Sequence, residues 1–250
     1  MTNIAVITGA ASGIGGSTKD RVLATGGKVL GIDMAGAQEH EDLAWIQGDV
    51  ADPDTWKKVS DKLGALGWQP DALVTAAAFL AVGNVLELTD DEWSKTLGVN
   101  LNGLVLAART ILPGMIERKC GSVVTIGSID SYMAEQGLIS YCASKGAILQ
   151  FTRALALDHA RDGVRANCVC PGVTDTPFFR RHLDTASDPQ KFLATREQRN
   201  PLGRLLQPDE IAATVEFLIG AGASGITGTE IVVDAGLTTG FDFRTGGEGA

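Results

Sequence analysis

A tyrosine and a lysine stand four residues apart in the segment YCASK, as Tyr141 and Lys145. On a helix this spacing places both side chains on one face. A phenol beside an ammonium can exchange a proton, because a neighbouring cation favours the phenolate. Ser128, at the end of the run SVVTIGS, adds a hydroxyl, and Asn100, in VNLNG, adds an amide. Each of these residues alone is a weak signal, and Tyr–Lys pairs at this spacing are common in helices.

A glycine-rich segment near the start, TGAASGIG, contains Gly9, Gly13 and Gly15. Glycine allows a tight turn and lets a phosphate approach the backbone at a helix N-terminus. Because the segment follows an apolar run, we interpret it as a turn that binds the pyrophosphate of a dinucleotide. A glycine-rich turn without a ligand is the alternative.

Two aspartates follow the next apolar runs. Asp33 ends the run KVLGID, where a carboxylate can accept hydrogen bonds from ribose hydroxyls and would repel a 2′-phosphate, so that NAD is favoured over NADP. No Arg or Lys stands within five residues after Asp33. Asp49, in GDV, can recognise the adenine amino edge. The alternatives are a solvated turn residue for Asp33 and a helix cap for Asp49.

The elements that must position these residues alternate between β-rich apolar runs and helical patterns. Most runs are apolar on both faces, as in parallel strands covered by helices on both sides. The sequence therefore predicts an α/β fold with a Rossmann-type doubly wound parallel sheet of about seven strands. The expected strands are 4–8, 28–32, 44–47, 71–76, 122–127, 164–170 and 230–234.

We expect one domain over residues 1–250, because no linker or internal repeat interrupts the pattern. A capping box at Thr89–Glu92 predicts a helix that runs towards Ile116, and Pro208 opens another helix. Two segments depart from the alternation: the long connection 174–206 and the glycine-rich tail 238–250. Long connections in compact domains are usually functional or mobile.

The net charge of −9 and the pI of about 4.8 argue against nucleic acid or anionic lipid as partners. Cys168 and Cys170 lie in an apolar run and are expected to pack in the core. The three histidines stand far apart, so we predict no metal site. Without a recognisable signal peptide or membrane-spanning run, we expect a cytoplasmic protein.

Taken in order, these motifs resemble the short-chain dehydrogenase/reductase family, in its single-domain form of about 250 residues. The resemblance covers nearly the whole chain. One departure is Thr75-Ala76-Ala77-Ala78, where the family usually has Asn-Asn-Ala-Gly, which puts one hydrogen bond of the central strand in doubt. The segments that carry the resemblance are TGAASGIG (8–15), Asp33, GDV (48–50), VNLNG (99–103), IGS (126–128), YCASK (141–145) and CPGVTDTP (170–177).

The resemblance implies a catalytic role for each of four residues. Tyr141 would be the general acid/base, and Lys145 would lower its pKa and hold the nicotinamide ribose. Ser128 would orient the substrate oxygen, and Asn100 would position a water in a proton relay. The cofactor, NAD, would be bound by Gly9, Ser12, Gly13, Ile14, Gly15, Asp33, Met34, Asp49, Val50, Ala76, Ala77, Tyr141, Lys145, Pro171, Gly172, Val173, Thr174 and Thr176.

For the substrate we expect a small polar or cyclic secondary alcohol, such as a sugar, a polyol or a dihydrodiol. Residues 174–206 would form a lid over it. Three alternatives remain open: a 3-oxoacyl-thioester reductase, an NADP-dependent reductase and a non-catalytic NAD-sensing regulator. The family implies a homotetramer, or else a dimer. Candidate substrate contacts are Asp130, Met133, Gln136, Phe179 and His182.

Overall fold

The computed structural model describes residues 4–240, and within them seven strands form one sheet. Each strand lies within one residue of the run predicted from the sequence. Apolar residues on both strand faces explain this agreement, since every strand except the last is largely buried. The strands are β1 (Ile4–Thr8), β2 (Lys28–Asp33), β3 (Leu43–Gln47), β4 (Ala72–Thr75), β5 (Gly121–Ile126), β6 (Val164–Pro171) and β7 (Glu230–Val233).

The strand order is β3-β2-β1-β4-β5-β6-β7, and all neighbouring strands are parallel. The chain winds outwards from β1 to β3 and then returns to place β4 on the other side of β1. In such sheets ligands bind beyond the carboxyl ends of the strands, where the winding direction reverses. The predicted doubly wound sheet is confirmed, and its switch point lies between β1 and β4.

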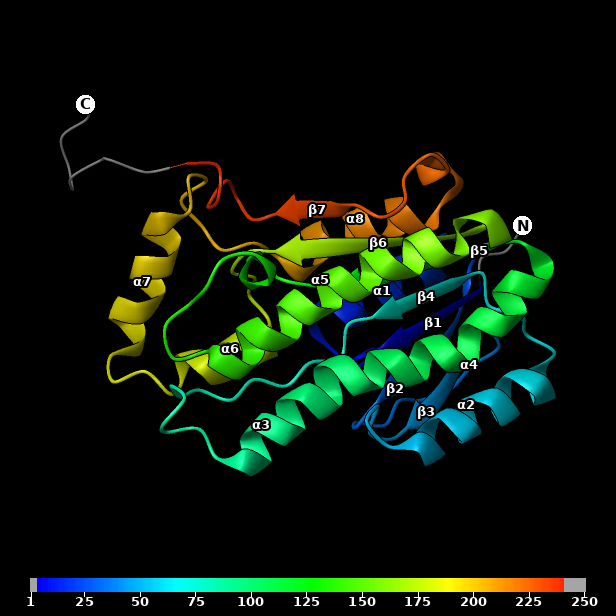
Figure 1. The fold of residues 1–250 in the computed structure, drawn as a ribbon, viewed down its shortest axis with the longest axis horizontal. Helices are drawn as coiled ribbons and strands as arrows, with labels where there is room; N and C mark the ends of the chain where they lie inside the picture. The colour runs from blue at the N-terminus through cyan, green and yellow to red at the C-terminus, as the bar shows by residue number, and fades with distance from the viewer. Residues whose placement is uncertain (1–3, 241–250) are drawn as a thin grey trace.

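Helices cover both faces of the sheet (Figure 1). On one face Val22, Ile211 and Val215 pack against the strands, and on the other Trp56 and Ile111 do so. Cys168 and Cys170 are fully buried in a smaller apolar cluster, as predicted for core residues. The first face carries α1 (Gly13–Ala24) and α8 (Pro208–Ile219), and the second carries α2 (Pro53–Leu66), α4 (Gly103–Arg118) and α5 (Ile139–His159).

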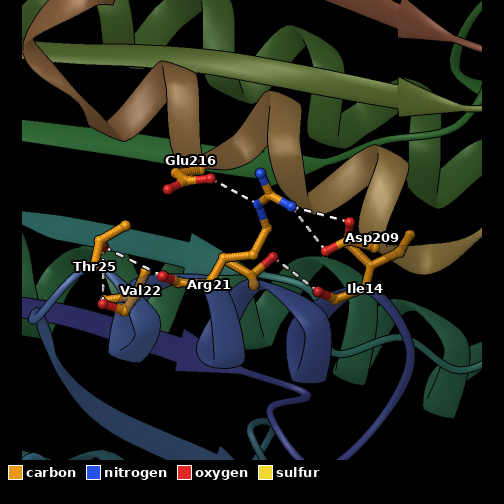
Figure 2. Close-up of polar contacts among 7 residues, drawn as sticks. Ile14, Arg21, Val22, Thr25, Asp209 and Glu216 are labelled. Carbon is orange, nitrogen blue, oxygen red and sulfur yellow. Dashed lines mark hydrogen bonds and ion pairs between the residues drawn. The ribbon is translucent and has the colours of Figure 1, made fainter.

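Arg21 of α1 links the two helices of the first face (Figure 2). Its Nε donates to Glu216 at 2.6 Å, and its Nη1 contacts both carboxylate oxygens of Asp209 at 2.9 Å. Exposed ion pairs contribute little to stability. Two carboxylates on one guanidinium nevertheless fix the orientation of α1 against α8.

The predicted helix after Thr89 forms, with an irregular turn in the middle. Thr89 and Glu92 make the expected capping box at the start of α3 (Asp90–Leu97). A π-helical turn, Gly98–Asn102, then leads into α4. Among the described residues, the run 90–118 is long and apolar enough to cross a membrane. However, it packs against the sheet through α4, and core helices of soluble proteins share these properties.

The connection 174–206 contains two short helices, α6 (Pro177–Leu183) and α7 (Pro189–Arg199). The side chain of Thr176 accepts a hydrogen bond at the start of α6, and that of Asp188 does so at the start of α7. Both helices lie near the carboxyl ends of β5 and β6 (Figure 1). Of the predicted tail 238–250, residues 241–250 lie outside the described part of the chain.

Candidate active site

The turn after β1 leaves no space for a side chain at two of its glycines. Gly9 has a φ of 67°, and a Cβ there would lie 2.8 Å from the main-chain nitrogen of Ala77. A Cβ on Gly15 would overlap the carbonyl oxygen of Gly9. Both glycines are therefore required for the turn to pack against the end of β4 and against itself. The turn leads into the N-terminus of α1, where main-chain N–H groups can bind a pyrophosphate.

Asp33 and Asp49 stand beside this turn. The carboxylate of Asp33 accepts hydrogen bonds from the main-chain N–H groups of Ala11 and Ala35, both at 3.0 Å. That of Asp49 accepts from the N–H of Ala51 at 2.9 Å. A carboxylate has about four acceptor positions. Each aspartate therefore keeps acceptor positions for a ligand while it holds its own loop.

A cavity of about 770 Å³ extends from these aspartates, past the switch point, to Tyr141. Its volume lies in the range of ordinary cofactor and ligand sites. Every residue that the resemblance assigns to the cofactor lines this cavity: Gly9, Ser12, Gly13, Ile14, Gly15, Asp33, Met34, Asp49, Val50, Ala76, Ala77, Tyr141, Lys145, Pro171, Gly172, Val173, Thr174 and Thr176.

Ser128, Tyr141 and Lys145 meet at the far end of the same cavity. The Nζ of Lys145 lies 5.4 Å from the centroid of the Tyr141 ring and donates to the carbonyl of Ile126 at 2.7 Å. Ser128 follows β5, and its hydroxyl donates to the Asp130 carboxylate at 3.0 Å. The end of β5 and the first turns of α5 thus bring a phenol, an ammonium and a hydroxyl to one place.

Burial has the largest effect on the pKa values of Tyr141 and Lys145. It raises the pKa of the Tyr141 phenol above its ordinary value, and the Asp130 carboxylate adds to the rise. Burial also lowers the pKa of Lys145 to about 8. In the protein alone, the pKa of Tyr141 is therefore raised, which is opposite to the lowering expected from Lys145. The phenol is protonated at neutral pH in this state and is an acid rather than a base.

Asn100 does not line the cavity, and its side-chain amide is hydrogen-bonded within the protein. It lies in the π-helical turn, where its Nδ2 donates to the carbonyl of Phe79 at 3.0 Å and to Ser144 Oγ at 2.9 Å. Its Oδ1 accepts from the N–H of Phe79 at 2.7 Å. The amide thus ties the segment after β4 to α5, one residue before Lys145.

The five predicted substrate contacts fall into two groups. Asp130, Phe179 and His182 line the cavity. Asp130 is buried rather than solvated, and burial raises its pKa. Met133 and Gln136 do not line this cavity but an adjoining, more open one of about 980 Å³. The loop between Ser128 and Tyr141 therefore lines both cavities.

Two features of the site were missed by sequence reasoning. Glu135 and Arg196 form an ion pair between the loop before α5 and helix α7, and both line the cavity. The two residues are 61 positions apart, so no spacing in the sequence signals the pair. Lys95 also lines the cavity, with its Nζ 4.4 Å from the ring centroid of Phe79.

At residues 75–78, where the sequence departs from the usual family pattern, the neighbouring strand β1 supplies hydrogen bonds to the main chain. The hydroxyl of Thr8, at the end of β1, accepts hydrogen bonds from the N–H groups of Ala76 and Ala77, both at 3.1 Å. Thr8 is buried. The ends of β1 and β4 are therefore tied together without the asparagine that the family usually has.

Known proteins resemble the chain over nearly its full length. The family model described as enoyl-(acyl carrier protein) reductase matches residues 9–238. Meso-2,3-butanediol dehydrogenase of Serratia marcescens is 35% identical, with 94% of each chain covered. The 2,3-dihydro-2,3-dihydroxybenzoate dehydrogenase of Escherichia coli is also 35% identical, with 94% of this chain and 96% of the relative covered.

Solved structures agree with this. The ligand-free aldohexose dehydrogenase of Thermoplasma acidophilum has a TM-score of 0.91 and 31% identity, with 98% of this chain and 97% of the other covered. Relatives above 30% identity over nine-tenths of the chain belong to the same family as well as having the same fold. The chain belongs to the short-chain dehydrogenase/reductase family of oxidoreductases, whose members bind a nicotinamide cofactor.

Proposed function

We propose that the protein is an NAD-dependent dehydrogenase of a small polar or cyclic secondary alcohol, such as a sugar, a polyol or a dihydrodiol. One observation carries the proposal. A single cavity joins the glycine-rich turn and Asp33 at one end to Ser128, Tyr141 and Lys145 at the other. Dinucleotide binding and proton transfer therefore share one continuous space.

The residues present fit a dinucleotide. The glycine-rich turn lines the cavity at the N-terminus of α1 and suits a pyrophosphate, and the carboxylate of Asp33 suits two ribose hydroxyls. A bound oxidised nicotinamide would supply the hydride acceptor and a positive charge. Lys145 is placed to hold the ribose, since its Nζ is fixed by the carbonyl of Ile126.

In alcohol oxidation Ser128 orients the substrate hydroxyl, and Tyr141 takes the proton as the carbon loses its hydride. In ketone reduction Tyr141 returns the proton. The phenol, protonated in the protein alone, needs cationic neighbours to act as a base, and Lys145 is one of them. Asn100 has a positioning role, because its amide links Phe79 to the residue before Lys145. This link would also support the proposed proton relay.

The lining of the cavity supports a hydroxylated substrate over an acyl thioester. Asp130 is buried, and its carboxylate is hydrogen-bonded to Ser128, so a second hydroxyl of the substrate would find an acceptor there. Relatives named for a butanediol and for a dihydroxybenzoate dihydrodiol agree with this. Turnover of sugars, cyclic diols and a 3-oxoacyl thioester with NAD(H) tests the proposal, and activity on the thioester alone would contradict it.

Asp33→Ala tests the cofactor. We expect the variant to bind NAD about tenfold more weakly and to prefer NAD over NADP far less, because it loses the ribose acceptors and the repulsion of a 2′-phosphate. Fluorescence titration with NADH and NADPH measures both dissociation constants. Asp49→Ala is the control, since it should weaken both cofactors alike. A wild-type protein that binds NADPH more tightly than NADH would contradict the NAD proposal.

We also propose a single functional domain in which residues 174–206 form a lid. Phe178 and Phe179 of α6 and Arg196 of α7 all line the cavity, and the Phe178 ring lies 5.9 Å from that of Tyr141. Lids of this kind exclude water from the reacting atoms. A cytoplasmic location remains part of the proposal, in line with the acidic composition.

For assembly we propose a homotetramer, with a dimer as the second choice. Helices around 92–117 and 138–161 would pair across one two-fold axis, and β7 would make another contact. Leu157 of α5 is 85% exposed, and Phe217 of α8 and Val232 of β7 are also exposed, which suits apolar interfaces. Light scattering should give four chains for the wild type and fewer for Leu157→Glu. A monomeric wild type would contradict the proposal.

A further inference from the structure

Arg196 and Glu135 stand at the boundary between the two cavities. Arg196 lies in the last turn of α7, and Glu135 lies in the loop that leads from Ser128 to α5. Their side chains form an ion pair, and both residues line the main cavity and also the outer one. An ion pair whose only role was to attach α7 to the rest of the protein would not need to line either cavity.

The guanidinium of Arg196 contacts Glu135 and Phe192, but only some of its N–H donors are used. Its Cζ lies 4.5 Å from the ring centroid of Phe192, so the plane is supported by an aromatic side chain. Among residues 4–240, its one hydrogen bond is from Nη2 to Glu135. A guanidinium has five N–H donors. Arg196 therefore offers unused donors at a fixed position, and its side chain keeps 17% of its exposure.

The groups around Arg196 suit an anionic ligand. His182 packs edge-on against Phe192, with ring centroids 5.3 Å apart, and lines the same cavity. Burial and the Arg196 charge both lower the pKa of His182, so its imidazole is neutral at pH 7 and offers an N–H donor. Arg181 adds a second cation to the cavity wall. The carboxylates of Glu135 and Asp130 are the opposing charges.

We propose that Arg196 anchors a carboxylate carried by the substrate, which competes with Glu135 for the guanidinium. The inference rests on the proposed dehydrogenase function and narrows its substrate to a hydroxy acid. A planar guanidinium binds a carboxylate through two parallel N–H···O bonds, which would also orient the carbinol carbon towards Tyr141. Glu135 occupies the site when no substrate is present, so that the partly buried charge of Arg196 always has a partner.

The two residues of the pair should have opposite effects on an acidic substrate. Arg196→Gln removes the anchor, and we expect kcat/KM for 4-hydroxycyclohexanecarboxylate to fall at least tenfold through KM, while that for the neutral 4-hydroxycyclohexanecarboxamide changes less than twofold. Glu135→Gln removes the competitor, and we expect KM for the acid to fall about threefold. A purely structural ion pair predicts that both variants impair both substrates alike.

The measurement is steady-state kinetics with NAD on the full chain, with NADH binding as a check that each variant is folded. If Arg196→Gln does not fold, Glu135→Gln and Arg196→Lys decide the question. The proposed carboxylate anchor is contradicted if kcat/KM of the wild type is as high for the amide as for the acid. It is also contradicted if the wild type oxidises neutral sugars or diols but not the acid. If no secondary alcohol is oxidised, the proposed function fails as well.

Discussion

Tyr141→Phe is expected to lower kcat for alcohol oxidation and for ketone reduction by about a thousandfold, the usual contribution of a positioned acid or base. The change removes only the phenolic oxygen. The ring is buried and packs against Phe178 at a centroid distance of 5.9 Å, so a phenylalanine fits the same space. The dissociation constant for NADH should therefore change less than about twofold. Stopped-flow kinetics and NADH titration separate the two effects.

Tyr132→Phe is the matched control, because Tyr132 lies in the loop before α5, is 45% exposed and lines neither cavity. It should leave kcat unchanged. Unchanged turnover in Tyr141→Phe would refute the catalytic assignment and would favour a nucleotide-sensing role. A wild type without turnover of any alcohol, but with tight NADH binding, would favour the same role.

The pH dependence of the wild type follows from the same phenol. Burial and Asp130 raise the pKa of Tyr141, so the free protein presents an acid at neutral pH. Ketone reduction needs that acid, and its kcat/KM should be flat near neutral pH. Alcohol oxidation needs the phenolate, and its kcat/KM should rise with pH over the same range, because kcat/KM reports the ionisation of the free enzyme.

The sheet could be predicted because its signals are local. A strand buried on both faces is a short apolar run, and its position does not depend on any distant residue. The helix starts are also signalled by residues within one turn: Thr89 and Glu92 mark the start of α3, and Pro208 marks the start of α8. The carboxyl ends of adjacent parallel strands meet at one edge, which explains why the glycine-rich turn, Asp33 and Asp49 line one cavity. The other cofactor residues were assigned through the family resemblance.

The rest of the site depends on contacts between distant residues. The π-helical turn at Asn100 is held by bonds to Phe79 and Ser144, which lie 21 and 44 positions away. No periodicity in the sequence encodes such bonds. Similarly, the loop that contains Met133 has no regular pattern, so the sequence could not tell which cavity it would line. The raised pKa of Tyr141 also arises from tertiary burial.

Lys145→Met should abolish most activity and yet make the protein more stable at pH 7. Lys145 is 2% exposed, and burial lowers its pKa from 10.5 to about 8. Holding the ammonium charged at pH 7 therefore opposes folding by about 3 kcal/mol. The methionine fills similar space without a charge but leaves the carbonyl of Ile126 without its donor, which costs about 1 kcal/mol. We expect a net gain of about 2 kcal/mol.

The sign of the pH dependence tests this argument. Between pH 8 and pH 10.5 the unfolded chain binds more protons at Lys145 than the folded protein does, so wild-type stability should rise with pH over this window. Urea unfolding at pH 7 and pH 10 should show this rise relative to Lys145→Met. Lys95→Met, which removes an exposed lysine, should follow the wild type. If the stabilities of the wild type and Lys145→Met changed in parallel with pH, Lys145 would have an ordinary pKa in the folded protein.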